Sequence, residues 1–489
     1  MSSSDDRTNS DVVVLGAGIS GLVAAYELER RGLRVEVLEA APQVGGRILT
    51  HRFGSADRAP FAELGAMRIP VDHRHTLRYV DELGLSAKLS TFRTLFSEDG
   101  AYHTTSVGFV RVRDAAADLV ADFRRELDGR GHHSEQAILF GAWLTAIGNA
   151  IAPANFRSSL HNDVSLKLLA LVEGVDLTPF LGGDRADRFD LHAFFATHPH
   201  LRATSDGRLN RFLDDILNET SPELLRLDGG MDQLTETLRR RLAGSVRCGQ
   251  EVVGLAVDGD RVALRIRHAG GTTVLHCGRV LCTIPFSVLR GLELEGLSAD
   301  KRAVIDEVQY WSATKVAFLC REPFWENDGI QGGASFSGGR VRQTYYPPVE
   351  GARERGAVLL ASYTMGDDAD ALGELDEAQR HKVVLDEVGA MHPQLHQPGM
   401  IKEIISQAWG QHRFSLGGGV TRWGMDSAAC ILERERASAP DGPLHFAGEH
   451  CSSTTAWIDG AVESALDAVA RLTADTAVRD VQVPAGSPS

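Results

Sequence analysis

The 489-residue chain is predicted to adopt an α/β fold, and two sets of sequence patterns point to it. Residues 11–39 pass from a short apolar run to a glycine-rich turn, a helical pattern and a second apolar run. Residues 251–266 and 309–319 alternate as strands do, whereas residues 108–230 carry mainly helical patterns. The chain is long enough for two or three domains that combine both kinds of element.

The N-terminal pattern has the features of a dinucleotide-binding unit. Val12–Leu15 form a β-branched apolar run typical of a buried parallel strand, and glycines follow at GxGxxG spacing. Gly16 would make the tight turn, Gly18 would let the backbone approach a pyrophosphate, and Gly21 would let helix and strand pack closely. The second strand ends on Glu39, which would accept hydrogen bonds from an adenosine ribose. Strand, glycines, helix, strand and acid together predict a Rossmann-type domain.

A second glycine pair follows the ribose-binding acid. Gly45 and Gly46 would allow another close pass of the backbone, and Arg47 offers a cation to the pyrophosphate. This extended fingerprint resembles that of the FAD-dependent amine oxidase superfamily, and the resemblance implies that the dinucleotide is FAD.

Two further segments resemble L-amino acid oxidases of the snake-venom and bacterial type. Glu63–Pro70 would pass beside the flavin and direct Arg68 at a substrate carboxylate. Lys315 lies in an apolar strand, where burying its charge is costly, and the resemblance implies that it holds a water against flavin N5. Tyr363 matches the tyrosine that shares the substrate carboxylate with the arginine.

The C-terminal segment Leu444–Ala461 resembles the closing motif of the same superfamily. The resemblance places Gly448 and Glu449 at the pyrophosphate and ribitol, and makes Trp457 one wall of the substrate cavity. Ala456 stands where the family more often has glycine, and its backbone carbonyl would contact the substrate amine. The N-terminus of the following helix would face flavin N1 and O2, where negative charge develops on reduction.

One departure from monoamine oxidases bears on both cofactor and substrate. Gly419 and Val420 stand where those enzymes carry the cysteine bonded to the flavin and a tyrosine wall. We therefore expect non-covalent FAD, and the incomplete aromatic cage points away from simple amines.

Composition and charge exclude several other classes of function. The net charge is −15 with no basic run, so we expect no nucleic-acid or anionic-membrane partner. The polar start and the lack of an apolar run of about 18 residues predict a cytoplasmic protein. His132-His133 and His198-Pro-His200 lack a complete ligand set, so we expect no metal. A homodimer or higher homo-oligomer is the default expectation for a soluble enzyme.

The domain organisation follows from the order of these motifs, with a substrate domain of mixed sheet and a helical insert between parts of the nucleotide domain. We expect helices over Val110–Leu127, Ser134–Asn149 and Leu209–Asn218 of the insert. The predicted boundaries are 11–50, 231–310 and 430–475 for the FAD-binding domain, 51–107 and 311–429 for the substrate-binding domain, 108–230 for the helical domain, and 1–10 and 476–489 for flexible termini.

The resemblance implies FAD-dependent oxidative deamination of L-amino acids, with aromatic or large hydrophobic side chains preferred. Substrate and O2 would give a 2-oxo acid, ammonia and hydrogen peroxide. The alternatives are an amino-acid 2-monooxygenase, a polyamine or monoamine oxidase, and a catalytically silent FAD protein.

The residues expected at these sites fall into two groups. Those expected at the substrate are Arg68, Lys315, Tyr363, Gly419, Ala456 and Trp457. Those expected at the cofactor are Gly16, Gly18, Ile19, Ser20, Gly21, Glu39, Ala40, Gly46, Arg47, Gly65, Ala66, Met67, Arg68, Val252, Gly448, Glu449, Trp457, Ile458 and Ala461.

Overall fold

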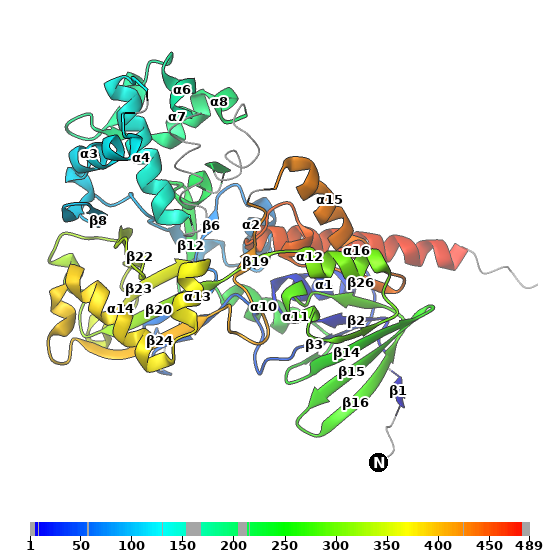
Figure 1. Cartoon of the computed structure of the whole chain (residues 1–489). Helices are drawn as coiled ribbons and strands as arrows, with labels where there is room; N and C mark the ends of the chain where they lie inside the picture. Colours follow the sequence, from blue (N-terminus) through cyan, green and yellow to red (C-terminus); the bar gives the residue numbers. More distant parts are fainter. Residues whose placement is uncertain are drawn as a thin grey trace, which may run out of the picture.

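The computed structural model has three regions: a nucleotide-binding region around a parallel sheet, a large second sheet, and a group of helices beyond that sheet (Figure 1). The structure describes residues 5–7, 9–55, 58–129, 131–152, 168–203, 213–214, 216–423 and 425–481.

The parallel sheet is built from segments that are far apart in the sequence. Its strand order is β13-β3-β2-β17-β26, and every neighbouring pair is parallel. Alternate residues of β2 pack into different cores, with Val12 and Val14 on one face and Val13 and Leu15 on the other. This double burial explains the unbroken apolar run in the sequence. The strands are β2 (Val12–Leu15), β3 (Val35–Leu38), β13 (Val246–Arg247), β17 (Val280–Cys282) and β26 (Leu444–Phe446).

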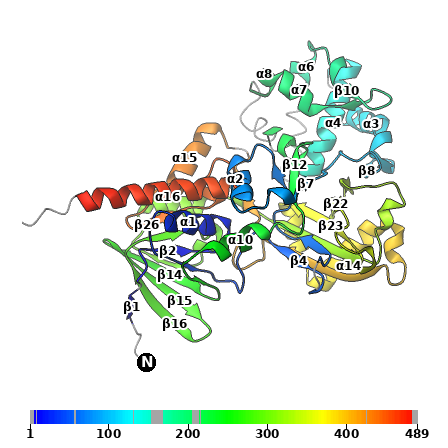
Figure 2. The same cartoon turned by 180° about the vertical axis from the view of Figure 1, so that it is seen from behind.

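Helices cover one face of this sheet. Helix α1 (Ile19–Glu29) contacts both α10 (Gln233–Arg241) and the C-terminal helix α16 (Ile458–Val481), as Figure 2 shows from behind. Residues 476–481 therefore belong to a helix rather than to the flexible terminus that we expected, and residues 482–489 lie outside the described part of the chain.

A second sheet, with two antiparallel and two parallel pairings between its strands, packs on the other face. The predicted hairpin is present as β14 (Glu251–Asp258) and β15 (Arg261–His268), and β16 (Gly271–Cys277) extends it to a meander. Its strand order is β1-β16-β15-β14-β18. Strand β1 (Asp5–Arg7) pairs in parallel with β16, so part of the expected flexible leader is ordered; residues 1–4 are not described.

The large sheet has seven strands in the order β24-β20-β23-β22-β21-β8-β9. All eight residues of the central strand β20 (Ala313–Cys320) are buried, and Lys315 lies directly opposite Tyr363 of β23. The helices α13 and α14 cover one face of the sheet (Figure 1). The other elements of this region are β8 (Tyr102–Thr105), β9 (Gly108–Arg111), β21 (Ala334–Phe336), β22 (Gln343–Tyr345), β23 (Ala357–Met365), β24 (Ile401–Ala408), α13 (Asp367–Gly373) and α14 (Glu377–Met391).

The helical region begins later than the sequence predicted. The expected helix from Val110 is wrong at its start, because Val110 pairs with His103 in the β8–β9 ladder and the helix α3 spans only Ala116–Leu127. Helix α4 (Glu135–Ile151) begins as predicted, since the Ser134 side chain accepts a hydrogen bond from the Ala137 N–H at 3.2 Å. Of the helix expected over 209–218, residues 213–214 and 216–218 are described and helical, and the others lie outside the described residues.

Shorter elements connect these regions. Apart from 3₁₀ turns, they are α2 (Arg74–Glu82), α6 (Leu169–Val172), α7 (Leu191–Thr197), α8 (Pro199–Ala203), α11 (Phe286–Leu289), α12 (Ala299–Glu307), α15 (Ser427–Ser438), β4 (Thr50–Arg52), β5 (Phe61–Glu63), β6 (Ile69–Pro70), β7 (Leu89–Thr91), β10 (Leu181–Gly182), β11 (Arg188–Phe189), β12 (Leu224–Leu227), β18 (Glu293–Glu295), β19 (Tyr310–Trp311) and β25 (Gly419–Val420). Within the part of the chain that the structure describes, no helix is long and apolar enough to cross a membrane.

The close packing at Gly21 gives a test of the nucleotide-binding fold. A Cβ at this position would overlap the carbonyl oxygen of Gly16, whereas a Cβ at Gly18 would meet no atom within 4 Å. We expect Gly21→Ala to lower the free energy of unfolding by about 3 kcal/mol or more, because backbone atoms must move to accept the methyl group.

Gly18→Ala is the matched control, and calorimetric melting of the flavin-free proteins would compare the two. Gly18 already has an extended backbone, with φ −70° and ψ 177°, so its melting temperature should stay near that of the unmodified chain. Equal melting temperatures for the two variants would contradict this account of Gly21.

Candidate active site

A cavity of about 620 Å³ runs from the carboxyl ends of the parallel strands to β20 and β23 of the large sheet. It collects residues from both ends and the middle of the chain. Sixteen of the predicted cofactor residues, and all but two of the predicted substrate residues, line this cavity. They are Gly16, Gly18, Ile19, Ser20, Glu39, Ala40, Gly46, Arg47, Gly65, Ala66, Val252, Lys315, Tyr363, Gly448, Glu449, Ala456, Trp457, Ile458 and Ala461.

The turn between β2 and α1 is shaped to accept a phosphate. Gly16 has φ +97°, a conformation that favours glycine, and Gly18 leaves open space beside the backbone. The Ser20 hydroxyl is buried in the first turn of α1 without a hydrogen-bond partner. A helix N-terminus with an unpaired hydroxyl and an open approach fits the pyrophosphate of a dinucleotide.

The Glu39 carboxylate is held in place at the end of β3. One oxygen accepts the Ala17 N–H at 2.6 Å, and the other accepts the Ala41 N–H at 2.7 Å. Burial raises the pKa of Glu39, although these backbone donors oppose that effect. A carboxylate anchored in this way lines the cavity where the ribose of a dinucleotide would lie.

Arg47 and Glu449 form a partly buried ion pair at 2.7 Å, in which the Glu449 side chain is buried. The second oxygen of Glu449 accepts the N–H groups of Val420 at 3.2 Å and of Ala456 at 2.9 Å. Burial alone would raise the pKa of Glu449, but Arg47 and the backbone donors bring it below its ordinary value. The carboxylate therefore stays ionised and joins three separate segments around the cavity.

Lys315 is a buried cation that the backbone holds. Its ammonium donates to the Gly65 carbonyl at 2.6 Å and to the Glu63 carbonyl at 3.3 Å. It also lies 4.7 Å from the centre of the Tyr363 ring. Burial and the nearby Arg68 lower the pKa of Lys315 to about 7, against the opposing charge of Glu63. This side chain can therefore change its protonation state near neutral pH.

Arg68 is almost fully buried, with 5% of its side chain exposed. The central carbon of its guanidinium lies 5.8 Å from the centre of the Phe92 ring and 5.8 Å from the centre of the Trp457 ring. One amino group donates to the Tyr345 hydroxyl at 3.1 Å, and the other forms an ion pair with Glu219. The sequence motifs had not indicated Glu219, because the segment that carries it has no recognisable pattern.

Aromatic side chains make much of the wall around Lys315. Trp311, Tyr363, Trp409 and Trp457 all line the cavity. Trp409 is fixed by a hydrogen bond of 2.8 Å from its indole N–H to the Leu64 carbonyl. We had predicted only Tyr363 and Trp457. The position of Trp311 just before the lysine strand was a possible signal in the sequence, whereas Trp409 is brought in by β24.

Four predicted site residues do not line this cavity. Gly21 packs against the Gly16 carbonyl, and Arg68 is covered by its aromatic neighbours and Glu219. Gly419 lies in β25 and packs closely against Ala456. A Cβ added to Gly419 would stand 2.6 Å from the Ala456 Cβ. Met67 lines a different cavity.

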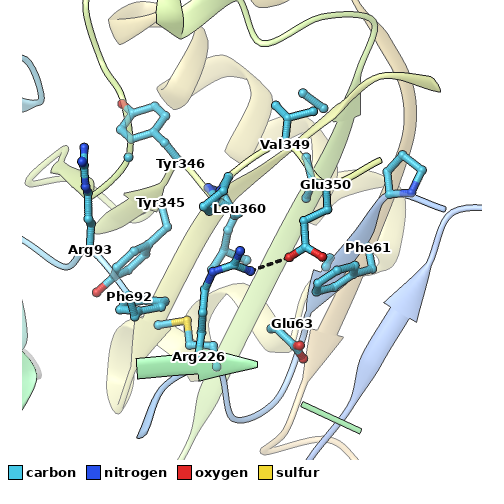
Figure 3. Close-up of a pocket in the computed structure, with 18 of the residues that line it drawn as sticks. Phe61, Glu63, Phe92, Arg93, Arg226, Tyr345, Tyr346, Val349, Glu350 and Leu360 are labelled. Atoms are coloured by element: carbon cyan, nitrogen blue, oxygen red, sulfur yellow. Dashed lines mark hydrogen bonds and ion pairs between the residues drawn. The ribbon is translucent and has the colours of Figure 1, made fainter. Parts of the chain in front are cut away.

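That second cavity has a volume of about 230 Å³, and Figure 3 shows side chains that line it. Figure 3 shows Phe92 and Tyr345 at one wall, and Glu350 beside Phe61 on the opposite side; Glu350 forms an ion pair with Arg226 at 2.6 Å. The two cavities share no lining residue. Phe92 and Tyr345 therefore contact Arg68 while also facing this separate space.

The described residues include no group of three or more His, Cys, Asp or Glu side chains that could hold a metal ion. The rings of His198 and His200 lie with their centres 5.8 Å apart. Among the described residues, these two histidines are not part of a group of three or more metal-ligating side chains.

Comparisons with known proteins agree with this geometry. A model of flavin containing amine oxidoreductases matches residues 19–473. The flavin-dependent L-tryptophan oxidase RebO of Lentzea aerocolonigenes is 64% identical over 463 residues, covering 95% of this chain and 98% of that protein. The L-amino-acid oxidase of Mus musculus is 30% identical over 483 residues, covering 94% of this chain and 70% of that protein. 

The structure of putrescine oxidase bound to putrescine has a TM-score of 0.62 at 21% identity, covering 96% of this chain and 100% of that one. That likeness supports the fold alone. The predicted α/β fold, the flavin cofactor FAD and the resemblance to amine and L-amino acid oxidases are confirmed. The chain belongs to the family of flavin containing amine oxidoreductases.

Proposed function

We propose that the protein is an FAD-dependent L-amino acid oxidase that prefers aromatic substrates such as L-tryptophan. In this reaction the amino acid, O2 and water give a 2-oxo acid, ammonium and hydrogen peroxide. The observation that carries the proposal is Arg68, a buried guanidinium close to the rings of Phe92 and Trp457, the second of which lines the aromatic cavity. A guanidinium in this setting is suited to a substrate that carries both a carboxylate and a large apolar side chain.

The substrate preference has independent support from the relatives. A chain that is 64% identical over nearly its whole length acts on L-tryptophan. The indole ring of tryptophan would be matched by the walls of Trp311, Trp409 and Trp457. Stacking and edge contacts between aromatic rings add about 0.5–1.5 kcal/mol per pair beyond their buried area.

The cofactor would be held by the residues that shape the nucleotide end of the cavity. Gly18 and Ser20 would face the pyrophosphate, Glu39 the ribose, and Glu449 the ribitol, with Arg47 as a further cation. Bound FAD supplies the hydride acceptor and later passes two electrons to O2. The FAD-binding segments 11–50, 231–310 and 430–475, the substrate-binding segments 51–107 and 311–429, and the helical segment 108–230 remain our proposed division of the chain.

The residues at the large sheet would orient the substrate. Arg68 and Tyr363 would bind the carboxylate, while the Ala456 carbonyl would accept a hydrogen bond from the amine. This two-point contact fixes the Cα–H in one direction, and positioning of this kind can account for much of the rate enhancement of an enzyme. Trp457 would form one wall of the substrate cavity. We also keep as hypotheses a homo-oligomer and a cytoplasmic location.

The central experiment is a peroxide assay with the purified holoprotein and each of the twenty L- and D-amino acids. Activity confined to L-amino acids, highest with aromatic ones, is the expected result. Product analysis separates the alternatives, because an amino-acid 2-monooxygenase would release an amide and carbon dioxide. Oxidation of amines in preference to amino acids would favour a polyamine or monoamine oxidase.

Removing Arg68 should reduce activity in a way that depends on the substrate carboxylate. Loss of one partner of a desolvated charge pair costs about 2–5 kcal/mol. Since about 1.4 kcal/mol corresponds to a factor of ten, kcat/KM for L-tryptophan should fall roughly 30- to 4,000-fold in Arg68→Ala. Arg68→Lys should recover only part of the activity, because an ammonium cannot make the two parallel hydrogen bonds.

The decarboxylated amine, tryptamine, is the control substrate for this comparison. Its slow oxidation should change little in Arg68→Ala, provided that the flavin content of the variant is normal. Wild-type rates with L-tryptophan in a fully loaded Arg68→Ala variant would remove Arg68 from the proposed role.

Lys315 should affect the reaction with oxygen more than the binding of substrate. Its ammonium could position a water and stabilise the negative charge that oxygen acquires on reduction, so Lys315→Met should slow reoxidation of the reduced enzyme. The pKa of Lys315 is lowered to about 7, so the ammonium is present below that pH and lost above it. The wild-type oxygen rate should therefore fall as the pH rises through about 7.

Stopped-flow mixing of reduced enzyme with oxygen at several pH values tests this expectation. The Lys315→Met rate should be lower and should not change through this pH range, while the affinity for a carboxylate ligand stays nearly constant. An unchanged oxygen rate would make Lys315 a structural residue only.

Acid precipitation should release all of the flavin into the supernatant. The reason is that Gly419 stands where monoamine oxidases carry the cysteine bonded to the flavin. Absorbance of the supernatant and of the washed pellet measures the partition. Flavin that remains with the denatured pellet would show that a covalent bond exists.

A further inference from the structure

We propose that Glu219 is an internal competitor for the substrate carboxylate: it occupies Arg68 in the free enzyme and is displaced when an amino acid binds. The inference rests on the proposed role of Arg68 in binding the carboxylate. It adds a residue from the helical segment to the site and makes substrate binding an exchange of one carboxylate for another.

The contact itself is the first argument. One amino group of Arg68 donates to the Tyr345 hydroxyl, and the ion pair with Glu219 occupies the other amino group. The rings of Phe92 and Trp457 also lie close to the guanidinium, with each ring centre 5.8 Å from its central carbon. A substrate carboxylate that used both amino groups of Arg68 would therefore need the position that Glu219 now holds.

The place of Glu219 is determined by its backbone rather than by chance contact of a long side chain. The Thr94 hydroxyl donates to the Glu219 carbonyl at 2.7 Å, and the following residue, Thr220, contacts His192 at 3.1 Å. Thr94 is itself 1% exposed. These contacts hold the backbone so that the carboxylate is directed at Arg68.

Burial determines which partner moves. The Arg68 side chain is 5% exposed and is enclosed by rings, whereas the Glu219 side chain is 14% exposed. Glu219 is thus the partner that can return to water with less loss. Both carboxylates could not stay ionised side by side at one guanidinium without strong repulsion.

The exchange has a measurable consequence for affinity. A buried arginine without a counter-ion is costly, so Glu219 stabilises the free enzyme and lowers the fraction that is ready to bind a carboxylate. The apparent Kd of a carboxylate ligand is its intrinsic Kd divided by that fraction. A ligand without a carboxylate leaves Glu219 in place, and its affinity does not include this term.

The test compares the wild-type holoenzyme with Glu219→Gln, which keeps the shape of the side chain but removes its charge. The probes are indole-3-acetate and its neutral analogue indole-3-ethanol, with binding followed by the flavin absorbance. We expect the Kd of indole-3-acetate to fall about 10-fold in Glu219→Gln and the Kd of indole-3-ethanol to stay within about two-fold. The KM for L-tryptophan should fall in parallel while kcat stays nearly constant.

Glu223→Gln is the matched control. Glu223 is exposed, lies four residues further along the same segment, and makes no hydrogen bond or ion pair with Arg68 among the described residues. Its substitution by glutamine therefore removes the same charge without changing the surroundings of Arg68. It should change neither Kd. Glu219→Ala provides a second variant, and the melting temperature of each protein without ligand shows whether it is folded.

Several results would overturn the inference. An unchanged or higher Kd for indole-3-acetate in a folded Glu219→Gln variant would do so, and so would binding that is absent from both proteins. An equal gain for indole-3-ethanol would mean that the variant opens the cavity in general. The proposed function fails by a different result, namely a wild-type holoenzyme that oxidises no amino acid.

Discussion

The ion pair between Arg47 and the buried carboxylate of Glu449 is the interaction on which the rest of the site depends. It joins the N-terminal nucleotide-binding segment to the C-terminal one, and the second carboxylate oxygen of Glu449 also accepts the N–H groups of Val420 and Ala456. A buried carboxylate that lost these donors would be costly to keep ionised. Glu449 therefore holds the segments of Arg47, Val420 and Ala456 in fixed positions relative to one another. The same carboxylate stabilises both the cofactor end and the substrate end of the cavity.

The other buried cations are satisfied in different ways, and the difference matters for function. Lys315 donates to two backbone carbonyls of the Glu63–Gly65 segment, so its surroundings do not depend on a movable side chain. Arg68 is paired with the side chain of Glu219, which can be exchanged for another carboxylate. One cation is thus suited to a constant electrostatic role beside the cofactor, and the other to reversible binding of an anion.

The large sheet fixes the position of Lys315 relative to Tyr363. Antiparallel register places Lys315 opposite Tyr363, so the two side chains share one face of the sheet and meet at 4.7 Å. Phe92 and Tyr345, which both contact Arg68, also form part of the wall of the second cavity (Figure 3). A change in either cavity can therefore reach Arg68 through its aromatic neighbours.

Local patterns in the sequence determined the nucleotide-binding strands, the glycine turn, the β14–β15 hairpin and the family, because each is encoded within about 30 consecutive residues. The same patterns named Arg68, Lys315, Tyr363, Glu449 and Trp457 through their motifs. Only the tertiary structure showed that Glu219 pairs with Arg68 and that Trp409 lines the cavity. It also showed that Gly419 packs against Ala456 and does not line the cavity. It also decided that β1 is ordered and that α3 begins late, because strand pairing with distant residues outweighs local propensity. Contacts between residues that are 150 or more positions apart, such as Arg68 and Glu219, leave no periodic trace in the sequence and arise only when the helical segment folds against the sheet.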